Sequence, residues 1–267
     1  ELANWIDQSA GRQATYGKTL ATLDMLIQES QAHKARDLIV GYMRYTTMLP
    51  TATRLYRLAN EKLLDDMERE SGYQTRDMTR FKSGMERIDR RYAASVEKAL
   101  LFEMLKRYSA LPMDERFSEF DKVFKLGKTF NGAKLRRTLD RMYSKTKLNE
   151  LDVRLAWMDK SVEEFKASRD PFIQYAVAMY DTNMEQERDD KELAGKLMKV
   201  RPLYMQAIIA FNRDQGKPVY ADANSSLRVA VGHVKGYSPQ DGLRAEPFTR
   251  LEGILAKDSG DDPFDSP

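Results

Sequence analysis

Residues able to carry catalysis or bind a metal are sparse in this sequence. It contains two histidines, His33 and His233, and no cysteine. The lack of cysteine excludes disulfides, thiolate metal sites and cysteine nucleophiles. His33 lies among polar residues, and His233 has no serine or carboxylate at a spacing typical of a triad, so both are interpreted as ordinary side chains. We therefore expect no catalytic residue, no metal ligand and no cofactor site; the substrate-binding residues are not identified.

Two further segments resemble ligand-binding loops only in part. Residues 127–129 (GKT) match the end of a phosphate-binding loop, but the leading glycine of that motif would fall on Lys122. The aspartates between residues 258 and 265 lack the alternate spacing of a calcium loop, and Pro263 interrupts them. The stretch before the first segment has a helical pattern where the motif needs a strand, so we reject a phosphate loop there, and we interpret the second segment as a solvated loop.

Basic residues form two clusters that raise the question of nucleic-acid binding. The clusters are Arg87, Arg90 and Arg91, and then Lys134, Arg136, Arg137 and Arg141. Acidic residues stand at helical spacing from them, at Glu86, Asp89 and Asp140. This spacing favours exposed faces neutralised by salt bridges over a site for a nucleic-acid backbone.

The overall charge agrees with that interpretation. Lys and Arg number 44 and Asp and Glu number 41, a net charge of +3, and charged residues make up 32% of the 267 residues. A dedicated nucleic-acid binder concentrates positive charge, so no nucleic-acid partner is expected. No apolar run is long enough to cross a membrane, and no basic start with an apolar run behind it marks a signal peptide.

The elements that position these residues are predicted to be helical from about residue 12 to residue 214. The regular apolar spacing of residues 78–92 predicts one amphipathic helix, whereas Pro50 is expected to end or bend the helix before it. Capping patterns predict helix starts near residues 149, 161 and 170. Pro202 is expected to kink or break the last long helix, which Gly216 and Pro218 end.

The pattern changes after that stop. Residues 226–234 alternate in the manner of a β-strand, and residues 248–256 fit either a second strand or a short helix. One or two strands do not form a stable sheet alone, so these residues need partners that the chain does not supply. Together with ends that fall inside a helix and a loop, this indicates a piece of a longer protein.

Three segments in this region carry a resemblance to a known family. They are residues 220–229 (YADANSSLRV), 232–239 (GHVKGYSP) and 247–258 (PFTRLEGILAKD). They resemble the stretch in bacterial dipeptidyl peptidases of the seven and eleven types that leads from an inserted helical domain back into a chymotrypsin-like catalytic domain. The helical part is similar at residues 89–92 (DRRY), 146–148 (TKL) and 154–157 (RLAW). Ala221 departs from the family pattern, which has proline there.

The resemblance implies a serine exopeptidase that releases dipeptides from the N-terminus of oligopeptides. It implies a mainly α fold, with residues 1–216 as an irregular multi-helix cap that is incomplete at its N-terminus. Residues 217–267 are then a connecting segment with the first strand or strands of the second catalytic barrel. The family's catalytic serine, histidine and aspartate lie outside this chain, so the segment alone is expected to be inactive. The full-length relatives imply a homodimer in the periplasm or at the surface of a Gram-negative bacterium.

Two other classes of function stay open at this point. The chain is also compatible with a stand-alone helical interaction or scaffold module that has no enzymatic activity. A helical nucleic-acid-binding protein is a weaker alternative, because the basic clusters have acidic neighbours.

Overall fold

The computed structural model describes residues 1–90, 92–219, 227 and 229–260. It divides into two compact units, residues 1–217 and residues 218–267, and each is described by itself. The chain is mainly α, as expected. In chain order, the helices of the first unit are α1 (Leu2–Asp7), α2 (Ala10–Tyr16), α3 (Thr19–Gln31), α4 (Lys34–Tyr42), α5 (Met48–Glu61), α6 (Met78–Glu86), α7 (Ala94–Tyr108), α8 (Ser118–Phe124), α9 (Gly132–Lys145), α10 (Leu151–Trp157), α11 (Val162–Ala167) and α12 (Pro171–Asp214).

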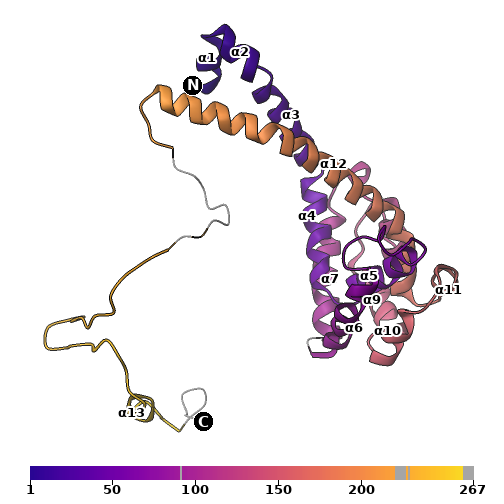
Figure 1. Ribbon diagram of the computed structural model, residues 1–267. Helices are drawn as coiled ribbons and strands as arrows, with labels where there is room; N and C mark the ends of the chain where they lie inside the picture. Colours follow the sequence, from indigo (N-terminus) through magenta and orange to yellow (C-terminus); the bar gives the residue numbers. More distant parts are fainter. Residues whose placement is uncertain (91, 220–226, 228, 261–267) are drawn as a thin grey trace. The chain divides into compact units, whose positions relative to one another are not determined.

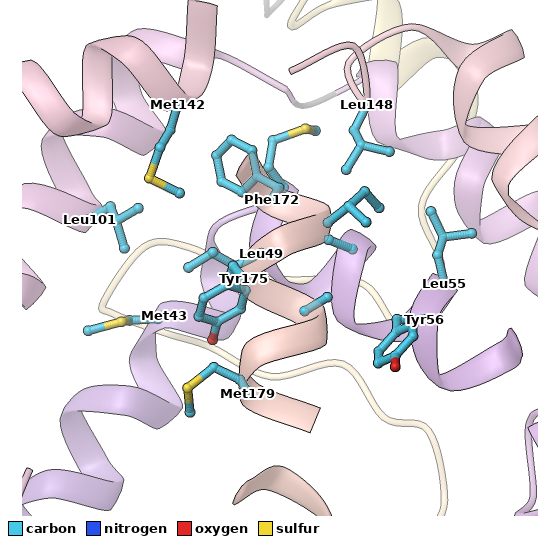
Figure 2. Close-up of a cluster of buried hydrophobic side chains, with 14 of the residues drawn as sticks. Met43, Leu49, Leu55, Tyr56, Leu101, Met142, Leu148, Phe172, Tyr175 and Met179 are labelled. Carbon is cyan, nitrogen blue, oxygen red and sulfur yellow. The ribbon is translucent and has the colours of Figure 1, made fainter. Parts of the chain in front are cut away.

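The core of the first unit is built around α5 and the first half of α12. Aromatic and sulfur-containing side chains meet there from several helices, with Phe172, Tyr175 and Met179 from α12 facing residues of α5 such as Leu49 (Figure 2). The contributing α5 stripe recurs at three- and four-residue steps, which puts it on one face. Burial of this face supplies the main driving force for folding of the unit.

Helix α12 spans 44 residues, about 66 Å of helix axis, and runs past the core to pack against α1, α2 and α3 (Figure 1). In its second half only Ala207 is buried. There Trp5 of α1 packs edge-on against Phe211 and donates from Nε1 to Asp214 at 2.8 Å. Trp5 thus joins α1 to the end of α12, and Arg12 of α2 adds an ion pair to the same Asp214 at 3.5 Å.

The start and stop of α12 follow the sequence signals. Asp170 is the N-cap, its Oδ1 accepting from the backbone N–H of Phe172 at 2.9 Å. At the other end Gly216 has φ of +68°, and the N–H of Lys217 bonds back to Asn212, a Schellman arrangement. The break expected as one alternative at Pro202 is absent, since the helix continues through that residue, and the other alternative, a kink, stays a prediction.

Other predicted boundaries were met in part. The amphipathic face of residues 78–92 is confirmed, with Phe81 and Met85 buried, but it is divided between α6 and a 3₁₀ turn at Arg87–Arg90. Pro50 neither ends nor bends a helix: it lies in the first turn of α5, where a missing N–H costs little. The start expected near residue 149 falls at Leu151, without a side-chain cap.

The second unit forms no strand in its described residues, so the strand expected over residues 226–234 is a wrong prediction for 227 and 229–234, while 226 and 228 lie outside the described residues. One isolated antiparallel bridge joins Tyr237 and Ala245. Residues Glu252–Leu255 form α13, the short-helix alternative. The alternating residues stay exposed because a strand needs a neighbouring strand to satisfy its backbone groups.

Candidate functional site

The two histidines considered for catalysis lie in different units of the chain. His33 is exposed at the start of α4 in the first unit, and His233 is exposed in the second. In the described part of the chain no group of three or more His, Cys, Asp or Glu side chains is placed to hold a metal ion. No described helix is long and apolar enough to cross a membrane. The acidic residues from 261 onward lie outside the described residues.

Residues 127–129 do not form a phosphate loop but a turn held by a buried arginine. Arg116 donates from Nη2 to the carbonyl of Gly127 at 3.2 Å and from Nε to Asp121 at 3.0 Å. The hydroxyl of Tyr108, beneath it, accepts the backbone N–H of Phe117 at 2.6 Å. Burial raises the pKa of Tyr108 to about 12. This cluster is a structural support that holds residues 116–127 together.

Arg154 is the largest fully buried side chain and joins three segments. Its Nη1 donates to the carbonyl of Leu148 at 2.8 Å and its Nε to the carbonyl of Met85 at 3.2 Å, and its Nη2 binds Asp89. The planar guanidinium suits this role because its donors point in three directions at once. Arg154 is the first residue of the RLAW segment, and its buried hydrogen bonds give this segment a structural role.

A second polar cluster joins α5 and α12. Arg57 donates to Glu187 at 2.5 Å and to Glu61 at 3.1 Å, and Lys191 bonds to Glu187 at 2.7 Å and to Glu70 at 2.6 Å. Hydrogen bonds from Arg57 lower the pKa of Glu187 to about 2, against an opposing effect of burial. Burial lowers the pKa of Arg57, but the hydrogen bonds that Arg57 donates to Glu187 and Glu61 outweigh this effect, and the pKa is raised.

A buried carboxylate from another helix caps the start of α5. Glu97 of α7 accepts the backbone N–H groups of Thr47 and Met48 at 2.5 and 3.3 Å, and the hydroxyl of Tyr143 donates to it at 3.0 Å. Burial, and then the negative charge of Glu97, raise the pKa of Tyr143. Sequence reasoning missed this cap because its donors and acceptor are about fifty residues apart along the chain.

The basic clusters differ from the expected salt-bridged faces. Asp140 pairs with Lys98 on α7 at 2.7 Å, and Asp89 pairs with Arg154, so neither neutralises its neighbouring cluster. Arg87 and Arg90 are exposed without an ion pair in the described residues, and Arg91 lies outside them. The prediction of neutralised faces was wrong, because Asp89 and Asp140 pair with tertiary partners and Glu86 makes no ion pair within the described residues.

Three residues of the second basic cluster, Lys134, Arg137 and Arg141, line a groove of about 650 Å³ between α8, α9 and the start of α12, whereas Arg136 lies over the ring of Phe102. A smaller groove of about 300 Å³, beside α5 and α12, contains the Arg57 and Glu187 cluster. Within the described residues, the threonine hydroxyls of the two grooves, Thr53 and Thr138, donate to backbone carbonyls and not to a base.

Comparison with known proteins places the chain among the peptidases. The profile of the family described as peptidase S46 matches residues 1–267. An Asp/Glu-specific dipeptidyl-peptidase of Shewanella putrefaciens is 42% identical over 93% of this chain, and a dipeptidyl-peptidase 7 of Porphyromonas endodontalis is 25% identical over 95%. The chain belongs to the peptidase S46 family.

The chain spans about a third of the length of these relatives, 33% of the first and 29% of the second. Among solved structures, the crystal structure of Porphyromonas endodontalis DPP11 is similar at a TM-score of 0.38 and 18% identity, over the whole of this chain and 40% of that one. The family is thus established on the sequence, over a helical segment of much longer proteins.

Proposed function

We propose that this chain is the helical cap segment of a serine dipeptidyl peptidase that releases dipeptides from the N-terminus of oligopeptides. The observation that carries the proposal is a peptidase family profile matching every residue of a chain that spans a third of relatives called dipeptidyl-peptidases. The catalytic serine, histidine and aspartate then belong to the rest of the polypeptide. No cofactor is needed for such acyl transfer.

Within this proposal residues 1–216 act as the cap and residues 217–267 return the chain to the second barrel. A rigid cap restricts a cleft to the free ends of peptides and excludes water from the reaction. The buried guanidinium of Arg154 and the Arg57–Glu187 cluster support such rigidity, since each fixes several segments at once. The full-length protein is proposed to be a homodimer in the periplasm or at the cell surface.

The first experiment compares residues 1–267 with the full-length gene product. Both are assayed on fluorogenic dipeptides carrying Asp, Glu or an apolar residue at the cleavage position. Turnover is expected only from the full-length protein, because the segment holds no described nucleophile–base pair. Turnover by residues 1–267 would refute the placement of the triad outside this chain, and inactivity of both would refute the peptidase activity.

The cap role is tested in the full-length protein by replacing residues 1–216 with a short Gly/Ser linker. Cleavage of N-acetylated peptides relative to free ones is expected to rise, because the restriction to free ends is lost. Labelling of the active serine by a fluorophosphonate controls for folding of the catalytic domain. An unchanged ratio in a labelled variant contradicts the cap role.

A further inference from the structure

The groove between α8, α9 and the start of α12 is a concentration of positive charge without matching negative charge. Seven cationic side chains line it, and no acidic one does. Lys122 forms an ion pair with Glu119 at 3.6 Å, outside the lining. Among the described residues the other six make no ion pair: Lys125, Lys134, Arg137, Arg141, Lys145 and Arg169.

The arrangement on α9 is unfavourable unless something neutralises it. Lys134, Arg137, Arg141 and Lys145 recur at steps of three and four, so they stand on one face beside the buried stripe of the helix. Like charges at these spacings repel. The only acid of α9, Asp140, is engaged by Lys98. Elsewhere on the surface, pairs such as Lys160–Glu164 and Lys196–Glu192 neutralise each other at the same spacing.

The dimensions and the lining of the groove suit an extended peptide. Lys134 and Lys145 are eleven positions apart on α9, about 16 Å along the axis, which an extended segment of about five residues spans. Val123, Met142 and Pro171 give it an apolar portion, and Gln174 offers hydrogen bonds to a peptide backbone. The guanidinium groups of the lining bind carboxylates through two parallel bonds.

The same features disfavour two other polyanionic ligands, a single-stranded nucleic acid and an anionic membrane. No aromatic side chain lines the groove, so it lacks the stacking platform on which single-stranded nucleic acid binds. Its charges line a recess rather than a flat face, whereas an anionic membrane presents a plane to a polybasic surface. An acidic peptide is left as the ligand that matches both charge and form.

We propose that the groove of α8, α9 and α12 binds an acidic peptide segment, with three or more carboxylates within about five residues. Arg137 and Arg141 hold its centre, and Lys134 and Lys145 its two ends. The site belongs to this chain and goes beyond the proposed peptidase activity: it stands whether or not the full-length protein releases dipeptides.

The test is a binding measurement on residues 1–267 by fluorescence anisotropy. The probe is an N-acetylated, fluorescein-labelled pentaglutamate, which presents no free amino terminus to a dipeptidyl peptidase, and pentaglutamine is its neutral counterpart. Binding of pentaglutamate alone is expected, weakening as salt rises from about 0.05 to 0.15 M because the interaction is ionic. Equal binding of the two peptides overturns the proposal.

The matched variants separate the groove from general electrostatic attraction. Arg137→Gln/Arg141→Gln is expected to weaken pentaglutamate binding about tenfold. Arg87→Gln/Arg90→Gln removes the same charge from an exposed turn away from the lining and is expected to change binding less than about twofold. Equal losses in both variants overturn the proposal. Lys134→Gln/Lys145→Gln gives a second variant, should the first fail to fold.

Thermal unfolding gives an independent readout. Arg137→Gln/Arg141→Gln is expected to melt at the same temperature as the wild type or higher, because it relieves like-charge repulsion on α9. A fall in the melting temperature means that these arginines support the fold and overturns their assignment as ligands. Tighter binding of a single-stranded oligonucleotide, or of phosphatidylglycerol vesicles, than of pentaglutamate assigns the groove to that class instead.

Discussion

Buried charged side chains set the behaviour of this protein at the scale of single residues. Arg154, Arg116, Glu97 and Arg57 each bind groups from separate segments, and all four are largely shielded from water. Removing one partner from such a cluster leaves buried polar groups without bonds, which costs more than the pair itself contributes. These positions are therefore where substitutions are expected to be most destabilising.

Arg154→Met is expected to lower the free energy of unfolding by about 3 kcal/mol. Methionine fills much of the same volume but leaves the carbonyls of Met85 and Leu148 without donors. Urea unfolding followed by far-UV circular dichroism measures the loss. Asp89→Asn is the matched control, with an expected loss below about 1 kcal/mol, since the Asp89 side chain is 48% exposed. Equal losses in the two variants contradict the role given to the carbonyl bonds.

Glu187 makes stability depend on pH in the acidic range. Its pKa of about 2 lies below the ordinary value of 4.5, so its ionised form stabilises the fold above about pH 4.5 and this contribution is lost as pH falls toward 2. The melting temperature of the wild type is expected to fall more steeply over that interval than that of Glu187→Gln. Asp189→Asn, at an exposed position on the same helix, serves as control. If the melting temperatures of wild type and Glu187→Gln fall in parallel with pH, the ionised form of Glu187 does not stabilise the fold as stated.

At the scale of elements, α12 connects the core to the N-terminal helices. Both carboxylate oxygens of its N-cap residue, Asp170, accept hydrogen bonds. Asp170 caps the helix through Oδ1, while its Oδ2 accepts from the hydroxyl of Thr146 at 2.8 Å and from the N–H of Lys147 at 3.2 Å. One carboxylate thus sets both the start of α12 and the end of α9. The groove proposed to bind acidic peptides lies between these same helices.

Asp170→Ala is expected to lower the free energy of unfolding by about 2 kcal/mol, at the upper end for a lost N-cap, because both sets of bonds disappear. Asp170→Asn keeps an acceptor for the cap but faces the N–H of Lys147 with an amide, so an intermediate loss is expected. Chemical denaturation of the two variants checks the order. A loss for Asn as large as that for Ala contradicts the capping contribution.

At the scale of the whole molecule, the buried residues all belong to the first unit. Every member of the hydrophobic core lies within residues 1–217, and no described residue of 218–267 is buried. A unit of this size buries enough apolar surface to fold by itself. In its described residues the second unit has one β-bridge and a four-residue helix, which do not provide a core.

Truncation after Lys217 is therefore expected to leave folding intact. Residues 1–217 should unfold cooperatively, with a melting temperature within about 2 °C of that of the complete chain. Differential scanning calorimetry of both chains provides the comparison. Loss of the cooperative transition in the shorter chain would show that residues 218–267 contribute to the stability of the helices.

The sequence by itself determined the family, the mainly α class and the termini marked by local chemistry, such as the capping box of Ser161 and Glu164 and the glycine stop at Gly216. These features depend on residues within one or two turns of each other, so periodicity and capping patterns reveal them. Only the tertiary structure decided which acid meets which base. Asp140 pairs with Lys98 of α7 instead of with the basic residues of α9, and Glu97 of α7 caps the start of α5. These pairings depend on distances in space, which the spacing of residues along the chain does not encode. Because Asp140 is engaged by Lys98, the positive charges of the groove beside α9 are left without an acidic partner.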